Sequence, residues 1–442
     1  MRHAPSLALI ALLAGCTVGP NYAGPPASPS ATPLHPGFAR ASETTPATAP
    51  ALARWWTSLS DPLLDQLEDR ALAGSPSVAV AEARLHQARA ALRLERANSA
   101  PNANASATVL HATLPGVDLG SSESGGSGGA GGGGGDTSLN FYNLGFDASW
   151  EIDLFGGRRR SVEAARAQLG AAEANVADAQ VSLTAEVAQT YISLRDAQNR
   201  LVLAKQSAEM QRRMLDLTRQ RFDRGTASAL DVERLTGQLE TTEGQVIPLG
   251  AELASYQNAL AVLVGEQPGS LDAMLAPAGR VPLPPAQVPV GDPAGLIQRR
   301  PDIRAAERQL AQRTAQVGTA EAARFPRLNF MGLIGIGGTD PGDVLNPDNL
   351  TALAAPMLQW GILDFGRGAA RVRQAQGVRD EAEANYRGAV LGALRDAEDA
   401  LARFGARRQT VASAARSRAS AGRAAGLMQQ RFRAGTTTLI DM

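Results

Sequence analysis

The chain has a single cysteine, Cys16, and it lies where its sulfur can be modified. Arg2 and His3 give a positive start, an apolar stretch covers residues 7–13, and the run Leu13-Ala14-Gly15-Cys16 follows. This run resembles a bacterial lipobox, which predicts a signal peptide at 1–15 and acylation of Cys16, with palmitate or a similar chain. The alternative is a plain secretory signal with a chance cysteine. We therefore expect an exported, lipid-anchored protein.

The other reactive residue types form no catalytic or metal-binding pattern. The four histidines are scattered along the chain, without the spacing of metal ligands. A phosphate-binding loop needs a Gly-Lys pair, and the only lysine, Lys205, follows an alanine. Acidic and basic residues balance at 43 each, so no net charge points to nucleic acid. We expect no enzyme, no cofactor, no metal site and no nucleic-acid partner.

Two copies of one short motif are the remaining candidates for a site. Arg221-Phe222-Asp-Arg-Gly225-Thr226 is matched, 210 residues later, by Arg431-Phe432-Arg-Ala-Gly435-Thr436, and each copy is followed by an aspartate, Asp231 or Asp441. The glycines are expected to provide the left-handed residue of a tight turn between two helices. In the plainest interpretation, the aspartates favour the N-terminal end of the next helix.

The same offset of 210 relates much longer blocks, so the chain is a tandem duplication. Trp150 matches Trp360, and Ala174-Asn175 matches Ala384-Asn385. Upstream the offset is 225, as between Pro101 and Pro326. The Gly/Ser run at 121–135 accounts for the extra 15 residues and is interpreted as a loop insertion in the first copy.

The elements that carry the two motifs are expected to be unusually long helices. Residues 158–224 contain no proline and one glycine, Gly170, which predicts a helix about 100 Å long. From Val162 to Leu183 the apolar and small residues repeat with 3-4 spacing, typical of a coiled coil. The seam then steps by four to Val187 and Tyr191, which indicates local unwinding. A returning helix is expected to end at Gly265.

Strands are expected between the helices, at about 102–114, 139–153, 327–338 and 349–363. Residues 142–152 alternate apolar and polar side chains, as in a strand with one face of each kind. Pro356 suggests a bulge or bend in the fourth strand. Strands of this length can cross a membrane. Inside the membrane a sheet cannot keep an open edge, because the backbone N–H and C=O groups of that edge would be unpaired in lipid. Because four strands cannot close a barrel alone, oligomerisation follows. The alternative is a water-soluble sandwich of four strands.

These patterns divide the chain into five parts, of which the signal peptide is the first. They are the signal peptide at 1–15, a lipid-anchored extended linker at 16–54, a first repeat at 55–270, a connector at 271–299, and a second repeat at 300–442. The linker is rich in Pro, Ala, Ser and Thr, and Asp61-Pro62 marks the start of the first helix.

Several motifs together resemble the outer-membrane factor (TolC-like) family of tripartite efflux pumps. More narrowly, they resemble the lipoprotein branch of NodT type, which serves resistance-nodulation-division (RND) transporters. The motifs are Cys16-Thr-Val-Gly-Pro20-Asn-Tyr22, Trp55-Trp56 with Asp61-Pro62, Trp150-Glu-Ile-Asp-Leu-Phe-Gly156, Arg300-Pro301-Asp302-Ile303, Phe325-Pro326 and the two Arg-Phe-x-x-Gly-Thr turns.

The resemblance implies a mainly α-helical protein with membrane β-structure, completed by trimerisation. Three chains would form a transmembrane β-barrel in the outer membrane and a long α-helical coiled-coil barrel in the periplasm, with a collar near the connector. The implied partners are two sister chains, a periplasmic adaptor, an inner-membrane RND transporter and outer-membrane lipid. Thr17, which stands where Asp would suggest inner-membrane retention, agrees with the outer membrane.

The resemblance also assigns roles to the two turns. The residues expected to contact the adaptor are Arg221, Phe222, Gly225, Thr226, Arg431, Phe432, Gly435 and Thr436. Asp441, and less directly Asp231, would form a carboxylate ring that gates the pore. The family continues past the second turn with another helix, so a sequence ending at Met442 is expected to be C-terminally incomplete.

The expected function is a passive outer-membrane conduit that exports drugs or other small molecules. A channel for protein (type I) secretion or metal efflux shares the fold and stays open as an alternative. A non-conducting periplasmic coiled-coil scaffold is an alternative of another class, which would have no use for alternating strands.

Overall fold

The computed structural model describes residues 17–25, 37–40, 54–114, 137–285 and 287–437. The expected signal peptide, Cys16, most of the linker, the Gly/Ser run and Asp441 lie outside these residues. Among the described residues, no helix combines the length and apolar character needed to cross a membrane.

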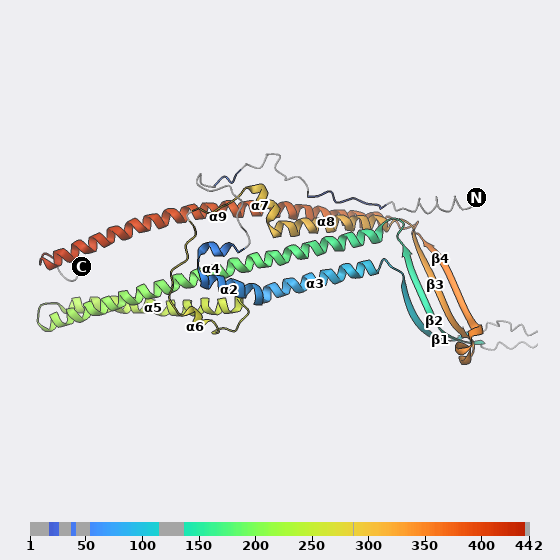
Figure 1. The fold of residues 1–442 in the computed structure, drawn as a ribbon, viewed down its shortest axis with the longest axis horizontal. Coiled ribbons are helices and arrows are strands. Elements are labelled where there is room, and N and C mark those ends of the chain that lie inside the picture. The colour runs from blue at the N-terminus through green and yellow to red at the C-terminus, as the bar shows by residue number, and fades with distance from the viewer. Residues whose placement is uncertain (1–16, 26–36, 41–53, 115–136, 286, 438–442) are drawn as a thin grey trace, which may run out of the picture. The chain divides into compact units, whose positions relative to one another are not determined.

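Helices dominate the described chain, and the strands are inserted in pairs between them (Figure 1). The helical elements are η1 (Trp55–Leu59), α2 (Pro62–Gly74), α3 (Pro76–Ala97), α4 (Gly157–Asp223), α5 (Ala229–Leu263), α6 (Asp272–Leu275), α7 (Pro293–Arg299), α8 (Pro301–Ala322), η2 (Pro341–Leu345), η3 (Pro347–Asn349) and α9 (Arg367–Arg433). The strands are β1 (Asn102–Leu114), β2 (Thr137–Ile152), β3 (Arg327–Gly338) and β4 (Leu350–Gln359).

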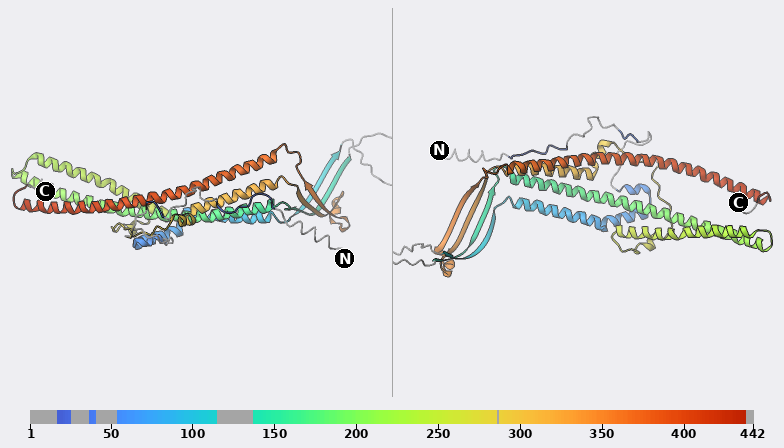
Figure 2. Two further views of the ribbon diagram at one scale, coloured as in Figure 1. Left: turned by 90° about the horizontal axis from the view of Figure 1, so that it is seen from above. Right: turned by 180° about the vertical axis from the view of Figure 1, so that it is seen from behind.

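The two longest helices confirm the expectation from the sequence. Both α4 and α9 have 67 residues and run without a break in every view (Figure 2). They occupy equivalent places in the two repeats, since α4 follows β2 and α9 follows β4. The predicted step in the α4 seam, at Val187 and Tyr191, falls where that helix enters a larger core with α2, α5 and α6. In this core α4 packs with three other helices, whereas each helix of a two-helix coiled coil packs with only one.

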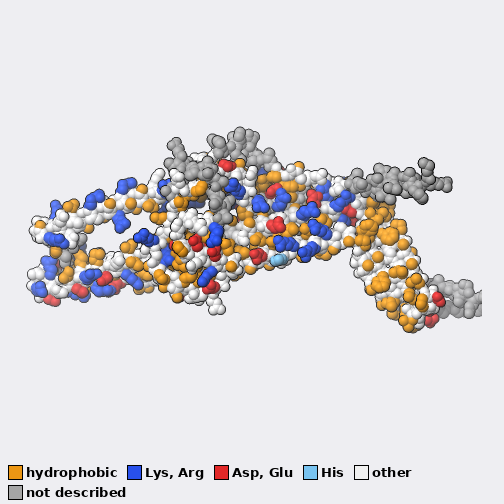
Figure 3. Space-filling view, in the orientation of Figure 1, with side chains coloured by type: hydrophobic (Ala, Val, Ile, Leu, Met, Phe, Trp, Pro, Cys, Tyr) orange, Lys and Arg blue, Asp and Glu red, His pale blue; other side chains and the backbone are white. Residues whose placement is uncertain are grey.

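The four strands form one antiparallel sheet in the order β1-β2-β3-β4. Its register places Ala105, Phe146, Ile334 and Ala352 side by side on one face. Large apolar side chains on this sheet are open to the surroundings; Phe146, for example, is 63% exposed. Figure 3 shows hydrophobic side chains gathered over the visible face of the sheet. Such a surface is suited to lipid rather than to water.

The fourth strand differs from the expectation in two respects. It ends at Gln359, which pairs with Arg327 at the start of β3, so Trp360 and the three residues after it lie outside the strand that was predicted to include them. The bulge expected at Pro356 was also wrong, because Pro356 pairs in regular register with Phe330. Within the described sheet β4 is an edge strand, where a residue without an N–H group is tolerated.

Two compact units divide the described chain, and each takes segments from both repeats. The first draws on Met1–Pro25, His86–Gly170 and Glu307–Ala384 and contains the sheet. The second draws on Pro26–Leu85, Ala171–Ala306 and Asn385–Met442 and contains the main hydrophobic core, in which Leu64, Tyr191 and Leu260 are fully buried. Both helical turns singled out in the sequence belong to this second unit.

Candidate functional site

The first candidate turn, between α4 and α5, is built as the sequence predicts. Gly225 has a left-handed φ of +73°, and its N–H donates to the Phe222 carbonyl at 2.8 Å. The N–H of Thr226 donates to the Arg221 carbonyl at 2.8 Å, and its hydroxyl donates to the same oxygen at 3.0 Å. These bonds satisfy carbonyls that the end of a helix leaves free.

The second turn, at the end of α9, repeats this geometry bond for bond. Gly435 also has φ +73°, and its N–H donates to the Phe432 carbonyl at 3.0 Å. Thr436 donates from its N–H and its hydroxyl to the Arg431 carbonyl, at 3.0 and 3.1 Å. Nothing lies within 4 Å of a Cβ added to Gly225 or Gly435, so glycine is required by backbone conformation and not by crowding.

Asp231, a candidate gate residue, has a local role in the structure. Its carboxylate accepts hydrogen bonds from the N–H and the hydroxyl of Ser228, at 3.2 and 2.8 Å, while the Ser228 hydroxyl accepts from the Asp231 N–H. This reciprocal pair is a capping box at the start of α5. The hydrogen bonds from Ser228 lower the pKa of Asp231, so its carboxylate stays charged at neutral pH.

The side chains beside the turns are available for contact. Phe222 is 45% exposed and Phe432 is 37% exposed, while Arg221 and Arg431 are also exposed. An aromatic ring next to a guanidinium is a common composition for a protein-binding surface. The assignment of these residues to an adaptor and of Asp231 to a gate stays a prediction, as does the gate role of Asp441, which is outside the described residues.

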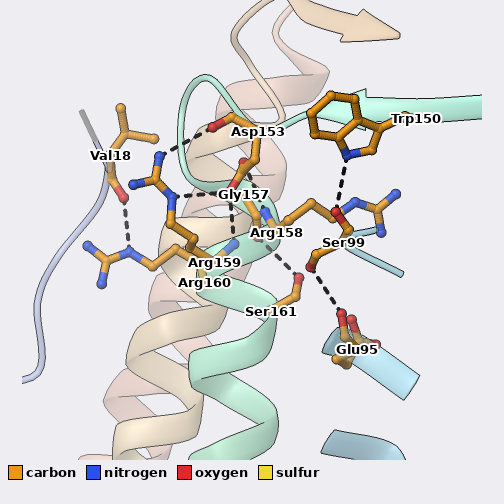
Figure 4. Close-up of polar contacts among 10 residues, drawn as sticks. All are labelled: Val18, Glu95, Ser99, Trp150, Asp153, Gly157, Arg158, Arg159, Arg160 and Ser161. Carbon is orange, nitrogen blue, oxygen red and sulfur yellow. Dashed lines mark hydrogen bonds and ion pairs between the residues drawn. The ribbon is translucent and has the colours of Figure 1, made fainter. Parts of the chain in front are cut away.

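A second site of interest holds the segment that follows Cys16, and the sequence did not reveal it (Figure 4). Arg160 on α4 is only 2% exposed, and its guanidinium donates to the carbonyls of Val18 and Gly19 at 3.1 and 3.0 Å. It also donates to the side chain of Asn21 at 2.7 Å and pairs with Glu163 at 2.8 Å. One buried cation therefore fixes the chain directly after the predicted acylation site.

We expect Arg160→Ala to release residues 17–22 from α4. Losing two charge-assisted bonds to carbonyls should lower the local opening free energy by about 3 kcal/mol and speed amide exchange about 100-fold. The amide to follow by hydrogen–deuterium exchange is that of Val18, which donates to the Phe155 carbonyl at 3.1 Å. Arg159→Ala is the matched control, since Arg159 is half exposed and pairs with Asp153 instead. Equal exchange in both variants would contradict the assignment.

A buried polar network fixes the connector to α4 in the second compact unit. Arg195 donates to the Tyr191 hydroxyl at 2.9 Å and to the Pro277 carbonyl at 2.6 Å. Tyr191 in turn donates to Asp61 at 2.8 Å, and Gln198 donates to the Leu275 carbonyl at 2.7 Å. Burial raises the pKa of Tyr191 to about 12, so its hydroxyl keeps the proton that it donates.

The same unit contains a buried carboxyl that has no partner. Glu68 on α2 is fully buried, and neither of its oxygens has a hydrogen-bond partner among the described residues. Burial, followed by the nearby charges of Asp69 and Asp65, raises its pKa to about 8. The sequence carried a signal for this position, since Glu68 falls on the apolar stripe formed by Leu64, Leu67 and Ala71.

The comparisons with known proteins agree with this architecture. The family described as outer membrane efflux protein matches residues 67–266 and 293–442, and the chain belongs to this family. Nodulation protein T of Rhizobium leguminosarum bv. trifolii is 31% identical over 98% of the chain and 88% of that relative. The toluene efflux pump outer membrane protein TtgF of Pseudomonas putida is 30% identical over 91% of the chain and 82% of that relative.

A solved structure extends the likeness to three dimensions. The outer-membrane channel OprN covers 96% of this chain, with 91% of its own chain aligned, a TM-score of 0.85 and 33% sequence identity. The family resemblance, the mainly helical fold with a small sheet and the internal repeat expected from the sequence are thereby confirmed.

Proposed function

We propose that the chain is the outer-membrane channel of a tripartite efflux pump of the RND type, a passive conduit from the periplasm to the exterior. The observation that carries this proposal is the structural match to an outer-membrane channel over nearly the whole chain. A conduit needs no catalytic group, which agrees with a sequence that offers none. The exported substrate is proposed only as a class, small molecules. The name of one relative, a toluene efflux pump outer membrane protein, supports this class.

The sheet supports a channel made from more than one chain. In the described sheet, β1 and β4 each have one edge without a strand partner. Such edges cannot face lipid, because their N–H and C=O groups would stay unpaired. Pairing β4 of one copy with β1 of the next removes every edge when the ring closes. A homotrimer then gives a twelve-stranded barrel in the outer membrane.

The contrast between the two strand-to-helix turns supports the same ring. In the first repeat, Phe155 stacks on Phe325 with ring centroids 4.6 Å apart, and Thr17 covers Gly156. In the second repeat the equivalent Phe365 is 91% exposed, and Gly366 has nothing near its Cβ direction. A ring would cover this second turn with the next copy, as the first turn is covered within its own chain.

The remaining parts of the proposal concern the anchor and the partners. Cys16 would carry the lipid, and Arg160 would hold the segment between that lipid and α4. The exposed Arg-Phe pairs at the two turns would contact a periplasmic adaptor, which connects the channel to an inner-membrane RND transporter. Asp441 and Asp231 would lie near the entrance, where carboxylates attract cations.

Single-channel recording separates a conduit from a scaffold. The purified lipoprotein in planar bilayers should give discrete conductance steps. Val109→Pro, which removes a backbone donor from the middle of β1, should give none, because the sheet can no longer close. A stable oligomer that never conducts would leave the scaffold as the better explanation. A secretion or metal-efflux channel would conduct as well and is distinguished by its cargo.

A further inference from the structure

The two faces of the sheet differ in composition. Over the part where all four strands pair, one face is apolar and carries Phe146, Trp150, Ile334 and Leu358 among others. In a closed ring this face meets lipid, and the opposite face, which we call the inner face, lines the lumen. On β1 and the residues of β2 paired with it, the polar or glycine residues of the inner face are Asn102, Asn104, Ser106, Thr108, Asn143, Gly145, Asp147 and Ser149.

On β3 and β4 the inner face is apolar instead. Met331 and Leu333 of β3 belong to it, Leu333 pairs with Leu353 of β4, and Met357 pairs with Asn329. Leu353 is 54% exposed, and both methionines are exposed as well. We call Met331, Leu333, Leu353 and Met357 the methionine–leucine patch. Large apolar side chains grouped on a surface that faces water mark a site for an apolar partner.

The duplication shows that the patch is a feature of the second repeat and not of the fold. At the offsets of 225 and 210, the first-repeat equivalents of the four patch residues are all polar: Ser106, Thr108, Asn143 and Asp147. On the lipid-facing side the two repeats agree in type, since Val109 corresponds to Ile334 and Ala148 to Leu358. The two repeats therefore differ on the inner face while they agree on the opposite one.

A carboxylate borders the patch. Asp147 of β2 pairs in register with Leu333 and belongs to the inner face. Its carboxylate accepts a hydrogen bond from the Asn104 amide at 3.3 Å and forms no ion pair within the described chain. Glu151, two residues further on this face, is instead paired with Arg158 at 3.1 Å. Asp147 therefore offers a negative charge to a cation beside an apolar surface.

A cavity adjoins the patch near the junction of β2 and α4. Its lining includes Met331 and Met357 together with Ser149. Leu333 and Leu353 continue the apolar surface along the strands. Methionine side chains are flexible and polarisable, so they adapt to different apolar shapes and favour contact with aromatic rings. A hollow with an apolar lining and a few polar groups is the usual form of a small-molecule site.

We propose that the methionine–leucine patch and Asp147 bind organic cations with an aromatic body during their passage through the lumen. The proposal rests on the closed ring of the proposed function, which places the inner face inside. Three chains would arrange three such sites between polar strips, and the polar strips keep the lumen wet. A small polar solute would gain nothing from the patch, and an organic anion would be repelled by Asp147.

Single-channel recording with a defined probe tests the site. Tetraphenylphosphonium, an aromatic cation, is added to the channel in a planar bilayer, and each binding event should interrupt the current. Met331→Gln and Leu353→Asn keep the approximate size of the side chain and remove its apolar character. Each should shorten the mean interruption at least about tenfold, because the probe loses its contact with a whole apolar side chain.

The same kind of substitution elsewhere on the inner face is the matched control. Leu110 also belongs to the inner face, and it lies about 20 Å along β1 from Asn104, the residue paired with Asp147. Leu110→Asn should leave the interruptions unchanged. A channel that conducts but shows no interruptions, or equal ones in Leu353→Asn and Leu110→Asn, would overturn the site and leave the proposed function standing.

A neutral probe separates the charge from the apolar surface. Asp147→Asn should shorten the interruptions by tetraphenylphosphonium up to about fivefold, since it removes one partly solvated charge pair. Interruptions by triphenylphosphine oxide, a neutral aromatic molecule of similar shape, should stay unchanged in this variant. Equal shortening with both probes would overturn the preference for cations.

Photolabelling tests the same site without conduction. A quaternary ammonium benzophenone is irradiated with the purified lipoprotein in lipid nanodiscs, and the labelled residues are mapped by mass spectrometry. Benzophenone reacts readily with methionine, so Met331 and Met357 should be labelled, and excess tetraphenylphosphonium should protect them. Protected labelling in an oligomer that never conducts would support the site and contradict the channel. Labelling without protection, or no stronger than at Met210, an exposed methionine on α4, would overturn the site.

Discussion

Replacing Gly435 by valine should abolish the drug tolerance that the complete pump confers, while the protein still inserts in the outer membrane. The φ of +73° at Gly435 is left-handed, and a β-branched residue there costs about 1–3 kcal/mol and distorts the turn. The turn bonds to the Phe432 and Arg431 carbonyls would then be lost together. The measurements are minimal inhibitory concentrations in a host with the partner pump, and membrane fractionation.

Two controls isolate the backbone effect in that experiment. Gly435→Asn should retain tolerance, because asparagine adopts left-handed backbone more readily than other residues. Gly426→Val places the same side chain within α9, in ordinary helical backbone with open space around it, and should have a much smaller effect. Tolerance unchanged in Gly435→Val would remove the turn from the proposed docking surface.

Raising the pH should destabilise the second compact unit through Glu68. Its pKa in the folded chain is about 8, against 4.5 for the unconstrained side chain. The folded state therefore binds this proton more tightly, and the stability it contributes is complete below pH 4.5 and is lost as the pH rises through 8. The loss is at most about 5 kcal/mol over that interval. Thermal unfolding in detergent between pH 5 and 9 measures it.

Substitutions at two glutamates test whether Glu68 is the source of the pH dependence. Glu68→Leu should keep the apolar stripe of α2 and flatten the pH dependence, with a higher melting temperature than the original chain at pH 9. Glu82→Gln on α3 removes an exposed carboxyl and should leave the slope unchanged. The same slope in Glu68→Leu and in the unmodified chain would exclude Glu68 as its source.

Features governed by local sequence were predictable. The 67-residue helix follows from an unbroken helical pattern, and the two glycine turns follow from a motif that repeats at a constant offset. The strands follow from period-two alternation, although β4 stops at Gln359, whose partner Arg327 is the first residue of β3. The end of a strand that is set by its partner strand is not visible in a local pattern.

Features governed by distant partners were not predictable. In the sequence, Arg160 is one of three consecutive arginines that look like surface residues. Only the fold brings the carbonyls of Val18 and Gly19 to its guanidinium. Arg195 lies one helical turn after Tyr191 on a buried stripe, which was a usable signal, but its partner Pro277 is 82 residues away. The sequence left Asp231 open between a gate and a helix cap. Its bonds to Ser228 show that it caps α5, and its gate role stays a prediction.

The boundaries between the two compact units fall inside helices. Among the described residues, the crossings at 85/86, 170/171, 306/307 and 384/385 lie within α3, α4, α8 and α9. A helix transmits order through successive hydrogen bonds, so melting on one side of such a boundary removes partners on the other. The units should therefore denature in one cooperative transition. A fragment produced by cutting the chain at a loop should not contain either unit in a form that folds independently.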